Sequence, residues 1–167
     1  MEGSEYLLTC AEVAVALAGF SALVVAIGGR GDSSIESLSR GLVGMLIERS
    51  LFAVFFSLVP VLLAGLNVAP AQLWFICSGG LATYIVSLAW RSAAARRQEP
   101  WLSEFLAGPA FAILMVLGLL VLLLQVAHAF GLGLRQNVWW YLVGLTWLLL
   151  SVAYIFYLAI RRWARAA

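Results

Sequence analysis

Residues 6–27 read YLLTCAEVAVALAGFSALVVAI, and this stretch decides the class of fold. It carries a single charge, Glu12. A helix rises about 1.5 Å per residue, so the stretch is long enough to cross a hydrocarbon core of about 30 Å. A carboxylate inside a membrane span is costly to keep, which makes Glu12 a candidate functional residue. We therefore interpret residues 6–27 as a transmembrane helix that contains one functional carboxylate.

The composition extends this interpretation to the whole chain. Hydrophobic residues make up 64% of the 167 residues and charged residues 11%, whereas soluble domains contain about 45–50% and about 25% respectively. A soluble fold of this length has too little interior to bury so much apolar surface. The chain is therefore expected to form one membrane domain over residues 1–167, surrounded by the lipid bilayer.

Four further apolar stretches predict an all-α integral membrane protein, a bundle of five transmembrane helices. An amphipathic segment at 34–49 leads into the second span, and a basic loop is expected at 91–100. The predicted spans are residues 6–27, 51–66, 71–90, 101–130 and 138–160. Glycines are expected to mark close contacts between the helices, and they are Gly19, Gly44, Gly65, Gly79, Gly80, Gly118 and Gly144.

The arginines predict the orientation. All ten basic residues are arginines, and with five spans only Arg135 falls on the side of the N-terminus. Cytoplasmic segments carry an excess of basic residues, so the N-terminus is expected outside and the C-terminus in the cytoplasm. The lack of lysine and the many alanines and leucines indicate a bacterial inner membrane. The arginines on the predicted cytoplasmic side are Arg30, Arg40, Arg91, Arg96, Arg97, Arg161, Arg162 and Arg165.

The first span has two faces of different character. One is a ridge of small residues at every fourth position, suited to close helix packing, formed by Ala14, Ala18, Ala22 and Ala26. The other is acidic toward the predicted outer end, narrow in the middle and basic at the inner end. Around a symmetry axis it would form rings, and carboxylate rings select cations. These pore or ion-binding candidates are Glu5, Thr9, Glu12, Ala16, Gly19, Leu23 and Arg30.

Two other interpretations of Glu12 remain open. It lies about two turns from the predicted outer end, so its side chain could reach the lipid headgroups. It could also form a hydrogen bond within its own subunit. The polar side chains at comparable predicted depth are Ser78, Gln125, His128 and Thr146.

Four residues are supporting polar candidates. Glu48 and Arg49 are adjacent, point about 100° apart on a helix and are expected to contact another helix or the membrane interface. His128 is the only histidine, and Gln125 lies three residues before it on the same helix face. A hydrogen-bonded histidine near the interface is expected. A pH-sensing role at the outer mouth is the alternative.

Several classes of function are not expected. The chain has no HExxH, GxSxG or Walker-type motif, so we do not expect an enzyme. One histidine and two cysteines in apolar spans predict neither a metal site nor a cofactor. The arginines lie beside the spans and form no basic domain face, which argues against nucleic acid as a partner.

The function predicted from these features is a homo-oligomeric, cation-leaning ion channel whose path is lined by the first helix. The alternative is a non-conducting scaffold or regulatory subunit. Its arginine-rich cytoplasmic face would dock a cytoplasmic or membrane protein partner. A small-solute transporter comes third, since the sequence has no evident internal repeat of the kind common in transporters.

Overall fold

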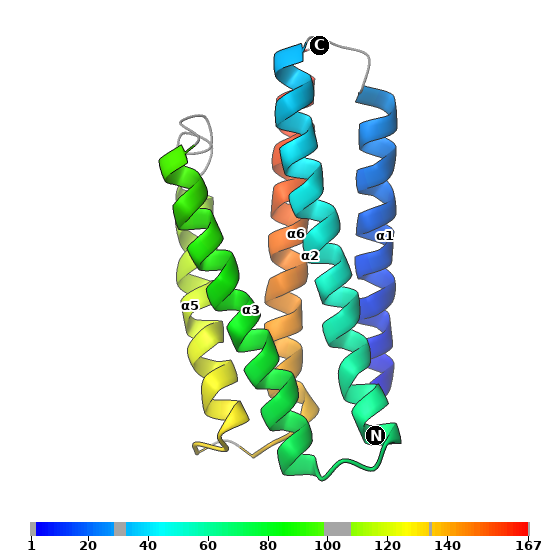
Figure 1. Cartoon of the computed structure of the whole chain (residues 1–167), viewed down its shortest axis with the longest axis vertical. Helices are drawn as coiled ribbons and strands as arrows, with labels where there is room; N and C mark the ends of the chain where they lie inside the picture. The colour runs from blue at the N-terminus through cyan, green and yellow to red at the C-terminus, as the bar shows by residue number, and fades with distance from the viewer. Residues whose placement is uncertain (1–2, 29–32, 99–107, 134, 167) are drawn as a thin grey trace. The chain divides into compact units, whose positions relative to one another are not determined.

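A computed structural model describes residues 3–28, 33–98, 108–133 and 135–166. The described residues form five helices and no strand, which confirms the all-α prediction (Figure 1). In chain order the helices are α1 (Ser4–Gly28), α2 (Ser33–Gly65), α3 (Pro70–Gln98), α5 (Pro109–Ala129) and α6 (Val138–Ala166).

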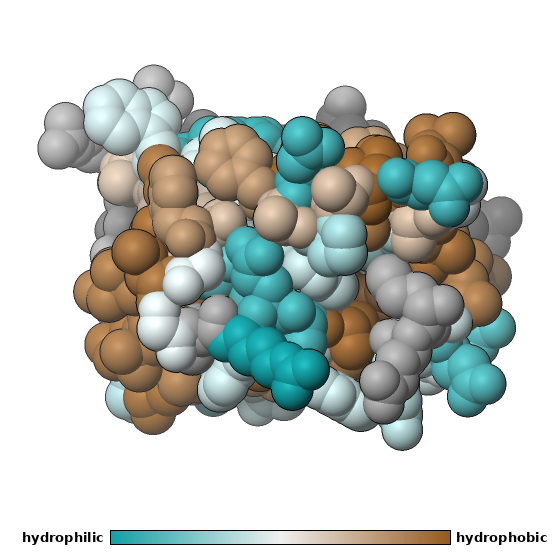
Figure 2. Space-filling model, turned by 90° about the horizontal axis from the view of Figure 1, so that it is seen from below, coloured by the Kyte–Doolittle hydropathy of each residue, from teal (hydrophilic) through white to brown (hydrophobic). Residues whose placement is uncertain are grey.

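Four of these helices contain stretches long and apolar enough to cross a membrane, which supports a multi-pass membrane protein. Helix α1 is not among the four. Figure 2 views the molecule end-on: hydrophilic residues gather on the end face, and hydrophobic residues lie mostly toward its edges. The four stretches are Gly44–Gly65, Pro70–Ala94, Pro109–Ala129 and Val138–Arg161.

The helix ends differ from the sequence prediction at two arginine-rich segments. Helix α3 continues to Gln98, so the loop expected from residue 91 is wrong as far as residue 98. Helix α6 likewise continues past the predicted end of its span at Ile160 to Ala166. Both segments are rich in alanine and arginine, which are strong helix formers, and this propensity outweighs the change in polarity.

Two other boundaries involve the second and fourth predicted spans. Helix α2 is continuous through the expected amphipathic segment and the second span. Helix α5 begins at Pro109, after an extended Gly108, because proline suits the first turn of a helix. The part of the fourth predicted span at 101–107 lies outside the described residues.

The chain divides into two compact units. We call Leu62–Trp147 the α3–α5 unit, because it contains α3, α5 and the first part of α6. We call Gly3–Val61 together with Leu148–Ala167 the α1–α2 unit, which contains α1, most of α2 and the rest of α6. Each unit is described by itself below.

Two glycines form close contacts inside the α3–α5 unit, as predicted. A Cβ atom on Gly118 would lie 2.5 Å from Cζ2 of Trp147, and one on Gly144 would lie 2.6 Å from Cδ2 of Leu81. The lack of a Cβ atom at both glycines therefore allows a large side chain to pack directly against a helix backbone. The prediction is wrong where no described atom lies within 4 Å of an added Cβ, which is the case at Gly19, Gly44, Gly65 and Gly79.

The turns after α2 and α5 have the same geometry. After α2, Asn67 adopts φ 56°, and the amide of Val68 donates to the carbonyl of Leu63 at 3.2 Å. After α5, Gly131 adopts φ 65°, and the amide of Leu132 donates to the carbonyl of Ala127 at 2.8 Å. These are the bonds of a Schellman motif, which needs a residue in the left-handed region after the helix. Both helices therefore end with their last carbonyls satisfied.

Candidate functional site

The predicted lining face of α1 is exposed along its described length. Glu5 and Glu12 both lie on the surface, and Leu23 is 56% exposed. The hydroxyl of Thr9 donates to the carbonyl of Glu5 at 3.0 Å, a bond within the helix that satisfies the hydroxyl proton. Arg30, at the far end of the predicted face, lies outside the described residues. The remaining exposed members of this face are Ala16 and Gly19.

The alanine ridge of α1 is buried toward the N-terminal end and exposed further along. Ala14 is fully buried, Ala18 is half-buried and Ala22 is exposed. The side chain of Ala26 lies outside the described residues. Among the described side chains of the ridge, burial thus decreases from Ala14 to Ala22.

A buried polar cluster lies at one end of the α3–α5 unit, centred on His128. The Nδ1 atom of His128 lies 2.8 Å from Oγ of Ser78 on α3. The backbone amide of Asn137, just before α6, donates to Nε2 of the same ring at 3.2 Å. Ser78 and His128 have 0% exposure. One imidazole thus connects α3, α5 and the start of α6.

The two bonds of His128 determine its tautomer. Nε2 accepts a proton from the amide of Asn137, so it carries no hydrogen of its own. A neutral imidazole then has its hydrogen on Nδ1, which donates to Oγ of Ser78. Both ring nitrogens are satisfied in this neutral form.

Gln125 forms a second connection one helical turn away. Its Nε2 donates to the backbone carbonyl of Trp140 on α6 at 2.8 Å. Gly144 leaves room for this amide, because a Cβ atom on Gly144 would lie 2.7 Å from Nε2 of Gln125. Gln125 has 0% exposure, and its Oε1 has no hydrogen-bond partner among the described residues. The amide therefore ties α5 to α6 at the cost of one unsatisfied buried oxygen.

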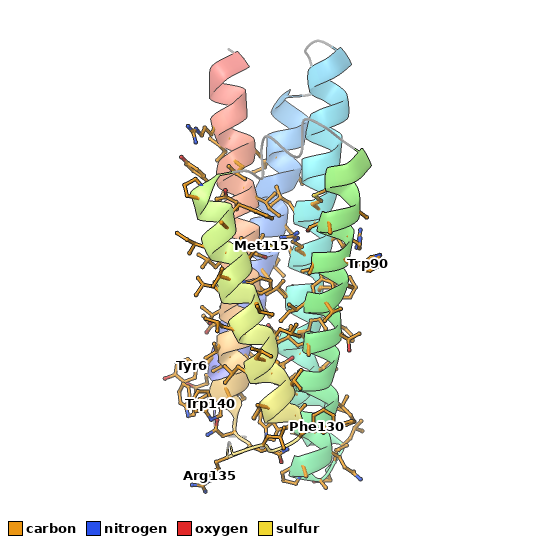
Figure 3. The ribbon with its side chains drawn as sticks, turned by 90° about the vertical axis from the view of Figure 1, so that its left-hand side faces the viewer. Tyr6, Trp90, Met115, Phe130, Arg135 and Trp140 are labelled. Carbon is orange, nitrogen blue, oxygen red and sulfur yellow. The ribbon has the colours of Figure 1, made fainter. Side chains whose placement is uncertain are left out.

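Aromatic rings surround the cluster. The ring of Trp74 lies 5.3 Å from that of His128 and 5.8 Å from that of Tyr141, measured between centroids. Tyr141 is fully buried, and Trp74 nearly so. Figure 3 shows Phe130 and Trp140 near the same end of this unit, with Arg135 on the connecting loop. The ring of Trp74 thus lies between those of His128 and Tyr141 and contacts both.

The loop between α5 and α6 is held by its polar side chains. Oδ1 of Asn137 accepts from the backbone amides of Trp139 at 3.1 Å and Trp140 at 3.4 Å, which caps the first turn of α6. Nε2 of Gln136 donates to the carbonyl of His128 at 3.3 Å. The loop that positions the amide beside the imidazole is therefore itself fixed at both ends.

The structure places the other candidate residues as follows. Ser78 and His128 bond each other and Gln125 bonds a backbone carbonyl, so each of these possible partners of Glu12 has a partner inside the α3–α5 unit. Glu48 and Arg49 are half-buried on α2, and neither is without a partner. Thr146 is exposed. Cys10 and Cys77 are free thiols.

Two structural contacts, those of Asn137 and Trp147, were not predicted from the sequence. Asn137 directly precedes an apolar run, which is a helix N-cap signal that could have identified its role. Trp147 is the single mid-span tryptophan, and its Nε1 donates to the carbonyl of Leu114 at 3.1 Å. Trp147 lies in the middle of the predicted span 138–160, away from both membrane interfaces. A tryptophan there is expected to be buried, and a buried indole N–H needs a hydrogen-bond acceptor, so this position could have predicted the contact. No group of three metal-ligating side chains occurs among the residues that the structure describes.

No family model, curated protein or solved structure matches the chain.

Proposed function

We propose that the protein is a homo-oligomeric, cation-leaning ion channel whose path is lined by α1. The observation that supports this proposal is the exposure of the α1 face on the single chain. Every described member of that face, Glu12 included, lies on the surface. Helices from several copies can therefore bring these faces together without rearranging the chain.

The energetic argument rests on Glu12. A charged carboxylate facing hydrocarbon costs about 2.5–3.5 kcal/mol at the centre of a span, so a lipid-facing Glu12 would be destabilising. Facing a water-filled axis removes this cost and gives the carboxylate a role. Glu5 and Glu12 would then form acidic rings that attract cations. Ala16 and Gly19 would form the narrow part of the path, where Gly19 has open space around its backbone.

The proposal includes the topology. Helix α1 has 25 residues and would be about 37 Å long, enough to act as a fifth span. Five spans place the N-terminus outside and the C-terminus in the cytoplasm, with the arginine-rich segments inside. The arginine-only basic set and the composition favour a bacterial inner membrane.

Conductance in reconstituted bilayers tests the proposal. Wild-type protein is expected to assemble as an oligomer and to pass cations. Glu12→Gln is expected to lower the cation conductance about tenfold, because neutralising a ring removes the local enrichment of cations. Val13→Ala, one exposed position further along α1, is the matched control and should conduct like wild type. Equal conductance of wild type and Glu12→Gln would exclude Glu12 from the path, and absence of current from the oligomer would exclude the channel.

The extended helices favour a second candidate, a non-conducting scaffold. Helices α3 and α6 carry their arginine-rich segments on continuous helix to Gln98 and Ala166. Helical segments of this kind would present basic residues to a cytoplasmic or membrane protein partner. Shortening α6 before Arg161 separates the two candidates: a scaffold would lose its partner, whereas a channel lined by α1 would retain its conductance.

A further inference from the structure

The side chain of His128 connects three segments of the α3–α5 unit by hydrogen bonds. It contacts α3 through Ser78 and the start of α6 through the amide of Asn137, while belonging to α5. Asn137 in turn caps the first turn of α6. A change at the imidazole is therefore passed directly to the connection between α5 and α6.

The pair of hydrogen bonds exists only while the imidazole is neutral. A protonated ring carries hydrogens on both nitrogens. Nε2–H would then point at the amide N–H of Asn137, and two donors cannot bond each other. The bond from Nδ1 to Ser78 would survive, since Nδ1 is already the donor. Protonation thus breaks the bond to Asn137, just before α6, and leaves the bond to Ser78 on α3.

The described part of the α3–α5 unit offers no anionic group to offset a positive charge on the ring. Two buried titratable groups on the helices packed against α5 are Tyr141 on α6 and Cys77, next to Ser78 on α3, both neutral in their ordinary forms. The charged side chains that the structure describes in this unit are Arg91 on α3 and Arg135 on the loop, both cations. No aspartate or glutamate occurs among residues 62–98, 108–133 and 135–147. A cationic His128 at 0% exposure would lack an anionic partner there.

We propose that His128 is an acid-sensitive latch, which holds the amide of Asn137 at neutral pH and frees it on acidification, while Gln125 still bonds the carbonyl of Trp140. The proposal is independent of the channel function. It assigns a regulatory role to a buried side chain in the α3–α5 unit, whereas the proposed ion path lies on α1.

Nitrogen NMR on the single histidine tests the latch directly. Protein labelled with ¹⁵N-histidine, without a histidine tag, in lipid nanodiscs gives signals from one imidazole only. At about pH 7.5 we expect Nδ1 protonated and Nε2 unprotonated, the less common tautomer in water. As the pH is lowered in steps below the ordinary imidazole pKa of about 6.5, we expect both nitrogens to become protonated and the Asn137 amide to exchange about tenfold faster once they are. Finding Nε2 protonated at neutral pH, or unchanged exchange at Asn137 after protonation, would overturn the proposal.

His128→Gln provides the matched variant. A glutamine oxygen can accept the Asn137 amide near the position of Nε2 but takes up no proton in this range. Wild type is expected to lose thermal stability between about pH 7.5 and about pH 5, and His128→Gln to lose markedly less. All carboxylates are common to both proteins, so their acid effects cancel in the comparison. The same loss in both proteins would refute the latch, and the tautomer measurement on wild type decides the matter if the variant does not fold.

Discussion

The two units treat their polar side chains in different ways. In the α3–α5 unit, three side-chain bonds join different segments: Ser78 to His128, Gln125 to Trp140, and Trp147 to Leu114. Thr83 and Ser87 of this unit donate to carbonyls of their own helix. In the α1–α2 unit, Ser57 donates to the carbonyl of Ala53 on its own helix. Thr9 and Ser151 also donate to carbonyls within their own helices.

This difference separates two uses of polarity in a membrane helix. A hydroxyl that donates its hydrogen to a carbonyl of its own helix does not hold a neighbouring helix in place, because that hydrogen is already used within the helix. A side chain bonded to another helix fixes the position of that helix. The α3–α5 unit therefore specifies its packing with hydrogen bonds, while the charged groups of α1 lie exposed, where a second copy can meet them. Three substitutions test this contrast.

Gly118→Ala is expected to have the largest effect. The new methyl group would overlap the indole of Trp147, and moving the indole breaks its bond to the carbonyl of Leu114. Overpacking and the lost hydrogen bond together are expected to lower the free energy of unfolding by about 2–4 kcal/mol. Equilibrium unfolding in mixed micelles measures this. Gly79→Ala is the matched control: its added Cβ meets no described atom within 4 Å, and alanine favours the helix. An equal loss in both variants would contradict the packing described for Trp147.

Ser78→Ala is expected to have an intermediate effect. It removes the acceptor for Nδ1–H of His128 and leaves a buried donor without a partner. The expected loss is about 1–3 kcal/mol of unfolding free energy. Chemical unfolding of the purified protein at neutral pH, where the ring is neutral, gives the value. A loss well below 1 kcal/mol would mean that the pair does not connect α3 to α5.

Ser57→Ala makes the same chemical change in the other unit and is expected to have the smallest effect. Ser57 is also fully buried, but its hydroxyl bonds only the carbonyl of Ala53, which keeps its place in the helix without it. We expect a change within about 0.5 kcal/mol under the same unfolding conditions. If Ser57→Ala matched Ser78→Ala, the distinction between the two units would fail.

The spans were predictable because hydrophobicity is a local property of the sequence. The segments around Gly44–Gly65 and Val138–Arg161 are visible as apolar runs without any knowledge of packing. The ends of α3 and α6 were harder, since composition marks where the membrane ends and helix propensity allows the helix to continue.

The polar cluster was predictable only in part. Gln125 and His128 were recognisable as polar residues on one helix face, because they lie three residues apart. Their partners were not: Ser78 lies 50 residues before His128, and the pairing depends on how α3 and α5 pack. The exposure of the α1 face likewise depends on which side of α1 the rest of the chain covers, and the hydrophobic pattern of α1 carries little information on this.

The boundaries between the two units fall inside helices. One lies between Val61 and Leu62 within α2, and the other between Trp147 and Leu148 within α6. Pro60 lies beside the first boundary and has no backbone N–H to donate to the carbonyl of Phe56. Helix α2 therefore lacks one backbone hydrogen bond at this turn, which makes the helix easier to bend there. Helix α6 contains no proline between Val138 and Ala166, so the second boundary lies in helix whose backbone amides can all donate.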